Sequence, residues 1–268
     1  MTLSVLRQKE WAFPVRPALR EVRKATPELD EGKPPVLFVP GFGHGAWVFA
    51  EHWLEHTADR GFPSYAMSLL GHGNSQPDPK ATILAYAHDV AQVAASLPRR
   101  AVIVAHGAGA LAAAHALSRY AAKAAVLLCP VFGGYGTALR NPFVCLPALF
   151  GKGLRLPAGQ LFSREVPANV ARGYAKKLGR ASSKAQWDLL RGKEPEDPVA
   201  NPLVLVVGSP DDRIVHDSSV RKVARRYGGA PLLFPGMGHD MMLDARWREP
   251  IDAILDWLDK LPSTQPKS

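Results

Sequence analysis

The stretch Ala101-Val-Ile-Val-Ala-His-Gly-Ala-Gly-Ala-Leu-Ala-Ala-Ala114 predicts a buried strand, a sharp turn and then a helix. Its first residues, Ala101–Ala105, are all apolar, which is typical of a central strand in a parallel sheet. Gly107 and Gly109 mark the turn, and the residues after it are small and apolar. This unit favours an α/β fold, because strands that alternate with helices form a mostly parallel sheet flanked by helices.

Other short apolar runs indicate the remaining strands. Residues Leu19–Ala25 alternate in part between polar and apolar side chains, as in an antiparallel edge strand. Further strands are expected at Pro35–Pro40, Tyr65–Leu69, Ala125–Cys129, Leu203–Val207 and Pro231–Phe234. Helices are expected at Ala50–Arg60, Ile83–Leu97, Leu111–Tyr120 and Arg246–Leu261.

The alternation of strands and helices breaks between Val131 and Asn201. Glycine and proline are dense up to Pro167, and two helical stretches follow, at Asn169–Leu178 and Ser182–Leu190. We predict that residues 131–201 form an inserted helical lid on a core made of residues 1–130 and 202–268. Such a lid would cover the strand ends, where α/β sheets bind their ligands. A disordered linker is the alternative.

The chain is basic, with a formal net charge of +9 over 268 residues. The basic residues gather between Arg140 and Lys193. This segment has eleven basic residues and only two acidic ones, Glu165 and Asp188. They indicate either a solvated face or a groove for an anionic substrate or an acidic carrier protein. No nucleic-acid motif accompanies them, so no nucleic-acid partner is expected. The basic residues are Arg140, Lys152, Arg155, Arg164, Arg172, Lys176, Lys177, Arg180, Lys184, Arg191 and Lys193.

Two features bear on the location of the protein. No apolar run reaches membrane-spanning length, and the first ten residues lack the charged start and apolar block of a signal peptide. The only cysteines are Cys129 and Cys145, and a disulfide scaffold is not needed at this size. We therefore predict a cytoplasmic protein without membrane insertion. Cys129 ends an apolar strand, which favours core packing over a reactive thiol.

Four loops, each after a predicted strand, carry short motifs. In chain order they are Phe38-Val-Pro-Gly-Phe-Gly-His-Gly-Ala-Trp47, Gly71-His-Gly-Asn-Ser75, Val207-Gly-Ser-Pro-Asp-Asp-Arg-Ile-Val215 and Gly236-Met-Gly-His-Asp240. In this order they resemble the oxyanion loop, the Gly-His-Gly-x-Ser turn, the acid loop and the histidine loop of the α/β-hydrolase superfamily. Pro40 departs from the pattern, since histidine is common there. The resemblance implies the α/β-hydrolase fold over nearly the whole chain outside the predicted lid.

The resemblance also implies roles for individual residues. His239 matches the general base, and Asp212 matches the acid that orients it, with Asp211 as the rival. A carboxylate fixes the tautomer of such an imidazole and stabilises its charged form. The backbone N–H groups of Phe42 and Ala108 match the oxyanion hole, which stabilises charge developing on a carbonyl oxygen.

The remaining polar residues of these motifs are expected to be structural. The resemblance gives this role to three histidines, because the family commonly carries histidine at comparable positions. Two serines lie in loops and are not nominated as nucleophiles. These residues are His44, His72, His106, Ser75 and Ser209.

Gly107 is the main departure from the family pattern. The family's turn reads Gly-x-Ser-x-Gly, with the nucleophilic serine in a strained backbone conformation. Here the five positions run from Ala105 to Gly109, and Gly107 stands at the nucleophile position. Glycine adopts such angles freely, so the turn is expected to persist while the hydroxyl is lost. A water or a substrate atom would fit beside His239.

Three functions follow from this departure. The first is an enzyme that uses His239 and Asp212 as an acid/base pair for elimination, cyclisation or water-mediated cleavage of a small carbonyl or ester compound. The second is an ordinary serine esterase or acyl-hydrolase in which glycine replaces serine, by natural loss or by design. The third is a protein that binds a ligand without changing it.

Cofactors and metals are not expected. The segment Gly107-Ala-Gly-Ala-Leu-Ala112 also fits the Gly-x-Gly-x-x-Ala dinucleotide fingerprint. That fingerprint requires an acid at the end of the next strand, which ends Leu128-Cys-Pro130 instead. No metal-ligand spacing is present either. A medium-sized, partly hydrophobic substrate with a carbonyl group is expected, because the predicted lid is apolar at residues 143–150 and basic elsewhere.

Overall fold

The computed structural model describes residues 18–133, 157–192 and 194–261. They form a seven-stranded sheet in the order β1-β3-β2-β4-β5-β6-β7. Strand β1 pairs antiparallel with β3, and every other pair is parallel. The predicted α/β class, the mostly parallel sheet and the antiparallel edge strand are confirmed.

The strands lie close to their predicted positions. They are β1 (Val22–Ala25), β2 (Val36–Val39), β3 (Ser64–Met67), β4 (Val102–His106), β5 (Ala124–Leu128), β6 (Leu203–Gly208) and β7 (Leu232–Leu233). The three central strands β2, β4 and β5 are buried along their whole length. Burial on both faces explains why their sequences are continuous apolar runs rather than alternating ones.

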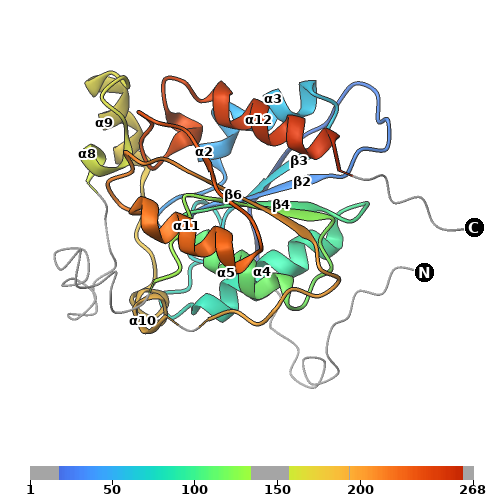
Figure 1. Cartoon of the computed structure of the whole chain (residues 1–268). Coiled ribbons are helices and arrows are strands. Elements are labelled where there is room, and N and C mark those ends of the chain that lie inside the picture. The colour runs from blue at the N-terminus through green and yellow to red at the C-terminus, as the bar shows by residue number, and fades with distance from the viewer. Residues whose placement is uncertain (1–17, 134–156, 193, 262–268) are drawn as a thin grey trace, which may run out of the picture.

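The helices cover both faces of the sheet (Figure 1). On one face lie α4 (Ile83–Ser96), α5 (Gly109–Leu117) and α11 (Asp217–Arg226), and on the other lie α2 (Trp47–Ala50), α3 (Trp53–Asp59) and α12 (Arg248–Asp259). Each face has its own apolar core, to which these helices contribute. A short 3-10 helix, η1 (Met241–Leu243), precedes α12.

The structure contains two helices where the sequence predicted one. The expected helix Ala50–Arg60 is divided into α2 and α3, and the backbone leaves the helical conformation at His52. Phe49, before the break, and Trp53, after it, both contact the ring of Phe38 on β2. Both rings are fully buried, so packing two large aromatic side chains on one strand outweighs a continuous helix.

Residues 157–192 contain α8 (Ala158–Leu161), α9 (Ala168–Lys177) and α10 (Ser183–Arg191). All three lie at one end of the sheet, with α8 and α9 on the side of α2 and α10 on the side of α4 (Figure 1). Three contacts bind this segment to the loops after the strands. The Leu161 carbonyl accepts from the Asp240 amide at 3.0 Å, the Gly179 amide donates to the Gly43 carbonyl at 2.8 Å, and the Ser182 hydroxyl donates to the Pro79 carbonyl at 2.9 Å. The lid of residues 131–201 stays a prediction, and its apolar stretch 143–150 lies outside the described residues.

Helix α5 begins directly against the loop after β2. A Cβ on Gly109 would overlap the carbonyl oxygen of Pro40. We expect Gly109→Ala to lower the free energy of unfolding by about 1–3 kcal/mol, as overpacking commonly does. Gly173→Ala is the matched control, because Gly173 lies inside α9 with nothing within 4 Å of its Cβ position. That variant should gain about 0.5–1 kcal/mol of helix stability. Urea unfolding of both variants measures the difference, and equal effects would contradict the close approach of α5 to Pro40.

Candidate active site

His239 and Asp212 form a buried pair at the ends of β6 and β7. The His239 Nδ1 lies 2.7 Å from the Asp212 Oδ2. The other oxygen of Asp212 accepts from the amides of Ile214 at 2.7 Å and Val215 at 3.0 Å. Because the carboxylate accepts on both oxygens, its orientation is fixed and Nδ1 of His239 carries the proton. The opposite nitrogen, Nε2, is then free to accept one.

The charges in this pair stabilise each other. Burial alone would raise the pKa of the Asp212 carboxyl, yet His239 and the two loop amides hold it below its usual range. Burial alone would lower the pKa of the His239 imidazole, but the charge and hydrogen bond of Asp212, followed by the charge of Asp240, raise it. His239 is therefore a stronger base than an ordinary histidine.

Gly107 stands in the turn between β4 and α5 in a left-handed conformation, with φ of +55°. Its amide donates to the Leu128 carbonyl at 2.9 Å, and its carbonyl accepts from Val131 at 3.0 Å. The predicted sharp turn is therefore present and is fixed by the loop after β5. A Cβ on Gly107 would lie 3.2 Å from the His239 Nε2. The imidazole thus faces the position that a nucleophilic side chain would occupy.

Phe42 and Ala108 both lie near Gly107. Ala108 follows it directly, and the Gly107 Cβ position is 3.8 Å from the Cα of Gly41, next to Phe42. Within the part of the chain that the structure describes, neither amide donates to another protein group. Both residues are buried. Unpaired N–H groups are costly at buried positions, which favours an oxygen from a ligand as their acceptor.

Four of the other residues singled out from the sequence have their partners outside this pair. Asp211 accepts from the Gly236 amide at 2.7 Å, so it holds the histidine loop rather than the imidazole. The Ser209 hydroxyl donates to the Met237 carbonyl, and the Ser75 hydroxyl to the Ser68 carbonyl. The His72 Nδ1 lies 3.1 Å from the Leu70 carbonyl, and burial lowers the pKa of His72 to about 4.

Sequence reasoning missed two features of the site. Asp240 lies beside His239 and faces His44 and His106. The sequence predicted separate structural roles for the two histidines and no role for Asp240. Cys129, expected in the core, is buried with its thiol hydrogen-bonded to Asp212, and burial raises the pKa of the thiol well above its usual range. It also has a positive φ, of 45°. The position of Asp240 directly after the predicted base was the one available signal.

Two buried groups combine side chains able to ligate a metal. They are His44, His106 and Asp240, and Cys129, Asp212 and His239, with the ligand atoms of each group within 4.8 Å of one another. In each group a histidine and an aspartate already contact each other directly, at 3.0 and 2.7 Å. A metal ion would have to displace these contacts.

Comparison with known families agrees with the geometry. A model of the alpha/beta hydrolase family matches residues 36–256. The chain belongs to this family. A comparison with curated proteins finds no match.

Several solved structures share the fold. A monoacylglycerol lipase from Paleococcus ferrophilus is 18% identical with a TM-score of 0.66, over 90% of this chain and 98% of that one. A soluble variant of monoglyceride lipase from Saccharomyces cerevisiae, in complex with a substrate analog, is 16% identical with a TM-score of 0.72, over 92% and 93%. A thermophilic esterase from Thermogutta terrifontis, with malate bound, is 18% identical with a TM-score of 0.66, over 91% and 94%.

These comparisons confirm the α/β-hydrolase fold. Family membership agrees with the prediction of an enzyme whose reaction class is open. At such low identities the likeness to the three structures bears on the fold alone. Among the described helices, none is both long enough and apolar enough to cross a bilayer.

Proposed function

We propose that this protein is an α/β-hydrolase-fold enzyme that works without a covalent nucleophile. His239, oriented by Asp212, removes or donates a proton, and the Phe42 and Ala108 amides stabilise the negative charge that develops on a carbonyl oxygen. Gly107 leaves room for a water or a substrate atom beside the imidazole. The reaction is an elimination, a cyclisation or a water-mediated cleavage of a small carbonyl or ester compound.

One observation carries this proposal. The Nε2 of His239 lies 3.2 Å from the place where a side chain at position 107 would begin. A base that accepts a proton from a bound group requires its acceptor nitrogen to face that group at hydrogen-bond range. The base faces the position that glycine leaves open, and Phe42 and Ala108 lie near it.

The test is proton transfer to and from a panel of small carbonyl and ester compounds in heavy water. We expect the protein to introduce deuterium at the carbon next to the carbonyl, or to release elimination or cleavage products, in at least one compound. Mass spectrometry measures both outcomes. Binding of a compound with neither exchange nor product after long incubation would instead favour a ligand-binding protein.

The second candidate is a serine esterase or acyl-hydrolase whose serine has been replaced by glycine. It is favoured by the retention of the His239–Asp212 pair and of the left-handed turn at Gly107. Both features are required for a serine nucleophile, and neither is lost here.

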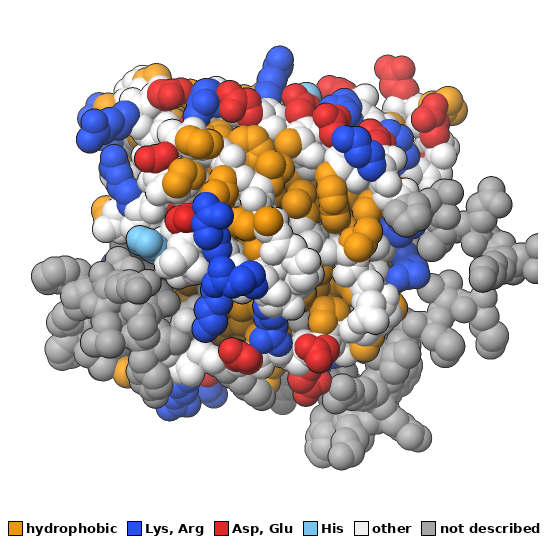
Figure 2. Space-filling view, in the orientation of Figure 1, with side chains coloured by type: hydrophobic (Ala, Val, Ile, Leu, Met, Phe, Trp, Pro, Cys, Tyr) orange, Lys and Arg blue, Asp and Glu red, His pale blue; other side chains and the backbone are white. Residues whose placement is uncertain are grey.

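The proposal also covers the basic surface and the predicted lid around the site. Lys and Arg side chains gather over α9 and along α11 (Figure 2). An anionic or carrier-bound small-molecule substrate would suit the basic residues around α9 and α10. The proposal includes the lid of residues 131–201 and a cytoplasmic location, and it needs no cofactor and no nucleic-acid or membrane partner.

The rate of proton transfer should depend on pH through His239. Only the neutral imidazole accepts a proton, so the rate should rise with pH and reach half its maximum above the ordinary histidine value of about 6.5, because Asp212 and Asp240 raise the pKa of His239. Asp212→Asn removes the larger of these two charges, and burial should then move the half-maximum to lower pH. Rate profiles between about pH 5 and pH 9 measure both values. If the rate rose with pH over the same range in the parent protein and in Asp212→Asn, the assignment of His239 as the base would be contradicted.

A further inference from the structure

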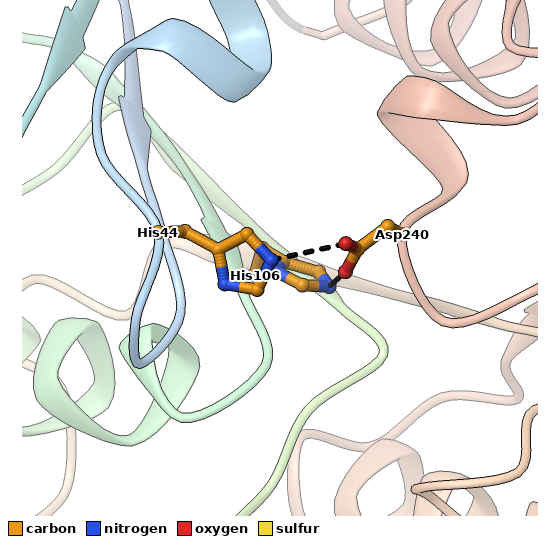
Figure 3. A group of neighbouring side chains, drawn as sticks. All are labelled: His44, His106 and Asp240. Atoms are coloured by element: carbon orange, nitrogen blue, oxygen red, sulfur yellow. Dashed lines mark hydrogen bonds and ion pairs between the residues drawn. The ribbon is translucent and has the colours of Figure 1, made fainter. Parts of the chain in front are cut away.

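Three segments of the site meet at the carboxylate of Asp240. His44 comes from the loop after β2, His106 ends β4, and Asp240 follows His239 (Figure 3). The His44 Nε2 lies 3.0 Å from the Asp240 Oδ2, and the His106 Nε2 lies 3.6 Å from the Oδ1. All three side chains are almost fully buried, at 2%, 0% and 0% exposed. A buried carboxylate is costly unless it is paired, so its partners matter to the site.

The hydrogen-bond partners assign the protons in this cluster. The His44 Nδ1 lies 2.9 Å from the Phe42 carbonyl, which can only accept, so Nδ1 carries hydrogen. Burial would raise the pKa of Asp240, but the neighbouring imidazoles, His44 first and then His106 and His239, hold it below its usual range. The opposite nitrogen of His44, Nε2, faces the Asp240 carboxylate at 3.0 Å.

His106 is different from His44. Its Nε2 donates to the carbonyl of His239 at 3.2 Å, while its Nδ1 has no partner within the described residues. Burial, with the nearby charge of His239, lowers the pKa of His106 to about 3. His106 therefore carries one proton and no charge.

We infer that Asp240 and His44 are positioning residues. They hold the carbonyl of Phe42, and with it the residue that carries the Phe42 amide, at a fixed place relative to His239. Asp240 is covalently next to His239, and His44 spans from its carboxylate to the peptide unit after Phe42. Its ring thus links the histidine loop to the oxyanion loop. This inference rests on the proposed function, because it assigns the Phe42 amide to the developing negative charge. A negative Asp240 also makes His239 a stronger base.

Two variants separate the two contacts of His44. Asp240→Asn keeps the shape of the side chain and removes its charge, and His44 should keep its donation to Phe42. In His44→Gln, the amide nitrogen can still reach Asp240, while the donor to the Phe42 carbonyl is lost. Asp252→Asn is the matched control, because Asp252 forms a contact of the same kind with His56, at 2.7 Å, on the surface.

The first measurement is NMR of protein labelled with ¹⁵N in histidine and in the backbone. In the unmodified protein, Nδ1 of His44 should carry hydrogen, because it faces the Phe42 carbonyl, and it should do so in Asp240→Asn as well. The Phe42 amide signal should move in His44→Gln and stay unchanged in Asp252→Asn. A Phe42 signal that does not move in folded His44→Gln would overturn the inference. His44→Gln keeps the test decisive if Asp240→Asn does not fold.

The second measurement uses activity as a separate readout. In protein carrying Gly107→Ser, acylation by an activated ester should be slowed at least about tenfold by His44→Gln, with little change in KM, since one oxyanion donor contributes about 10²–10³-fold. An unchanged acylation rate would overturn the positioning role. If Gly107→Ser alone shows no acylation, the catalytic assignment fails while the NMR result still decides whether His44 positions Phe42.

Discussion

Replacing His239 with alanine should lower the proton-transfer rate by about 10²–10⁴-fold, the usual contribution of a general acid or base. The imidazole is the group whose acceptor nitrogen faces the position opened by Gly107, at 3.2 Å from the Cβ position. The loss should therefore appear in the maximal rate more than in substrate affinity. Deuterium uptake by the compound found in the panel measures it directly.

A matched control distinguishes chemistry from folding. His56→Ala removes a histidine with the same type of carboxylate contact, at 2.7 Å from Asp252, but on the surface. It should leave the rate unchanged. Added imidazole should restore part of the activity of His239→Ala if the missing group is a base. Full activity of a folded His239→Ala protein would refute the proposed mechanism.

The sequence allowed the fold and most of the site to be predicted because both follow from local patterns. The central strands are buried on both faces, so each reads as an unbroken apolar run, as Val102–His106 shows. The turn was predictable from Gly107, whose φ of +55° suits glycine. The pairing of His239 with an acid was implied by the resemblance of the two loops to the acid and histidine loops of the α/β-hydrolase superfamily.

The rest depends on tertiary contacts that no local pattern encodes. Asp211 and Asp212 are adjacent and chemically identical, and only the folded loop shows that Asp212 contacts His239 while Asp211 binds Gly236. His44 and Asp240 are separated by 196 residues, so their contact was not readable from spacing. The break at His52 likewise follows from aromatic packing on the sheet, which outweighs helical periodicity.

Restoring the hydroxyl by Gly107→Ser should create an acyl-enzyme with activated esters. The added Cβ would lie 3.2 Å from the His239 Nε2, so the hydroxyl oxygen can reach hydrogen-bond range after the ring moves by a few tenths of an ångström. Serine at this φ costs on the order of 1–3 kcal/mol, as strained nucleophiles commonly do. We expect a burst approaching one acyl group per protein molecule, absent from the parent chain.

Gly107→Ala is the matched control, because it adds the same Cβ and the same backbone strain without a hydroxyl. It should show no burst, and mass spectrometry of the intact protein should show no acyl adduct. A burst from Gly107→Ser alone would mean that the base, the acid and the oxyanion donors are all placed for acyl transfer. No burst from folded Gly107→Ser would contradict that placement and would mean that the pocket is remodelled around the missing hydroxyl.

The interpretation of the burst depends on whether the parent protein is active on the panel of carbonyl compounds. If the parent exchanges or converts a carbonyl compound and Gly107→Ser gains the burst, one base and one pair of amides serve both reactions, and the hydroxyl decides between them. If the parent is inert on the panel and Gly107→Ser gains the burst, the chain is a serine esterase that has lost its nucleophile. The left-handed turn makes this comparison possible, because glycine holds the same backbone geometry that a nucleophile would need.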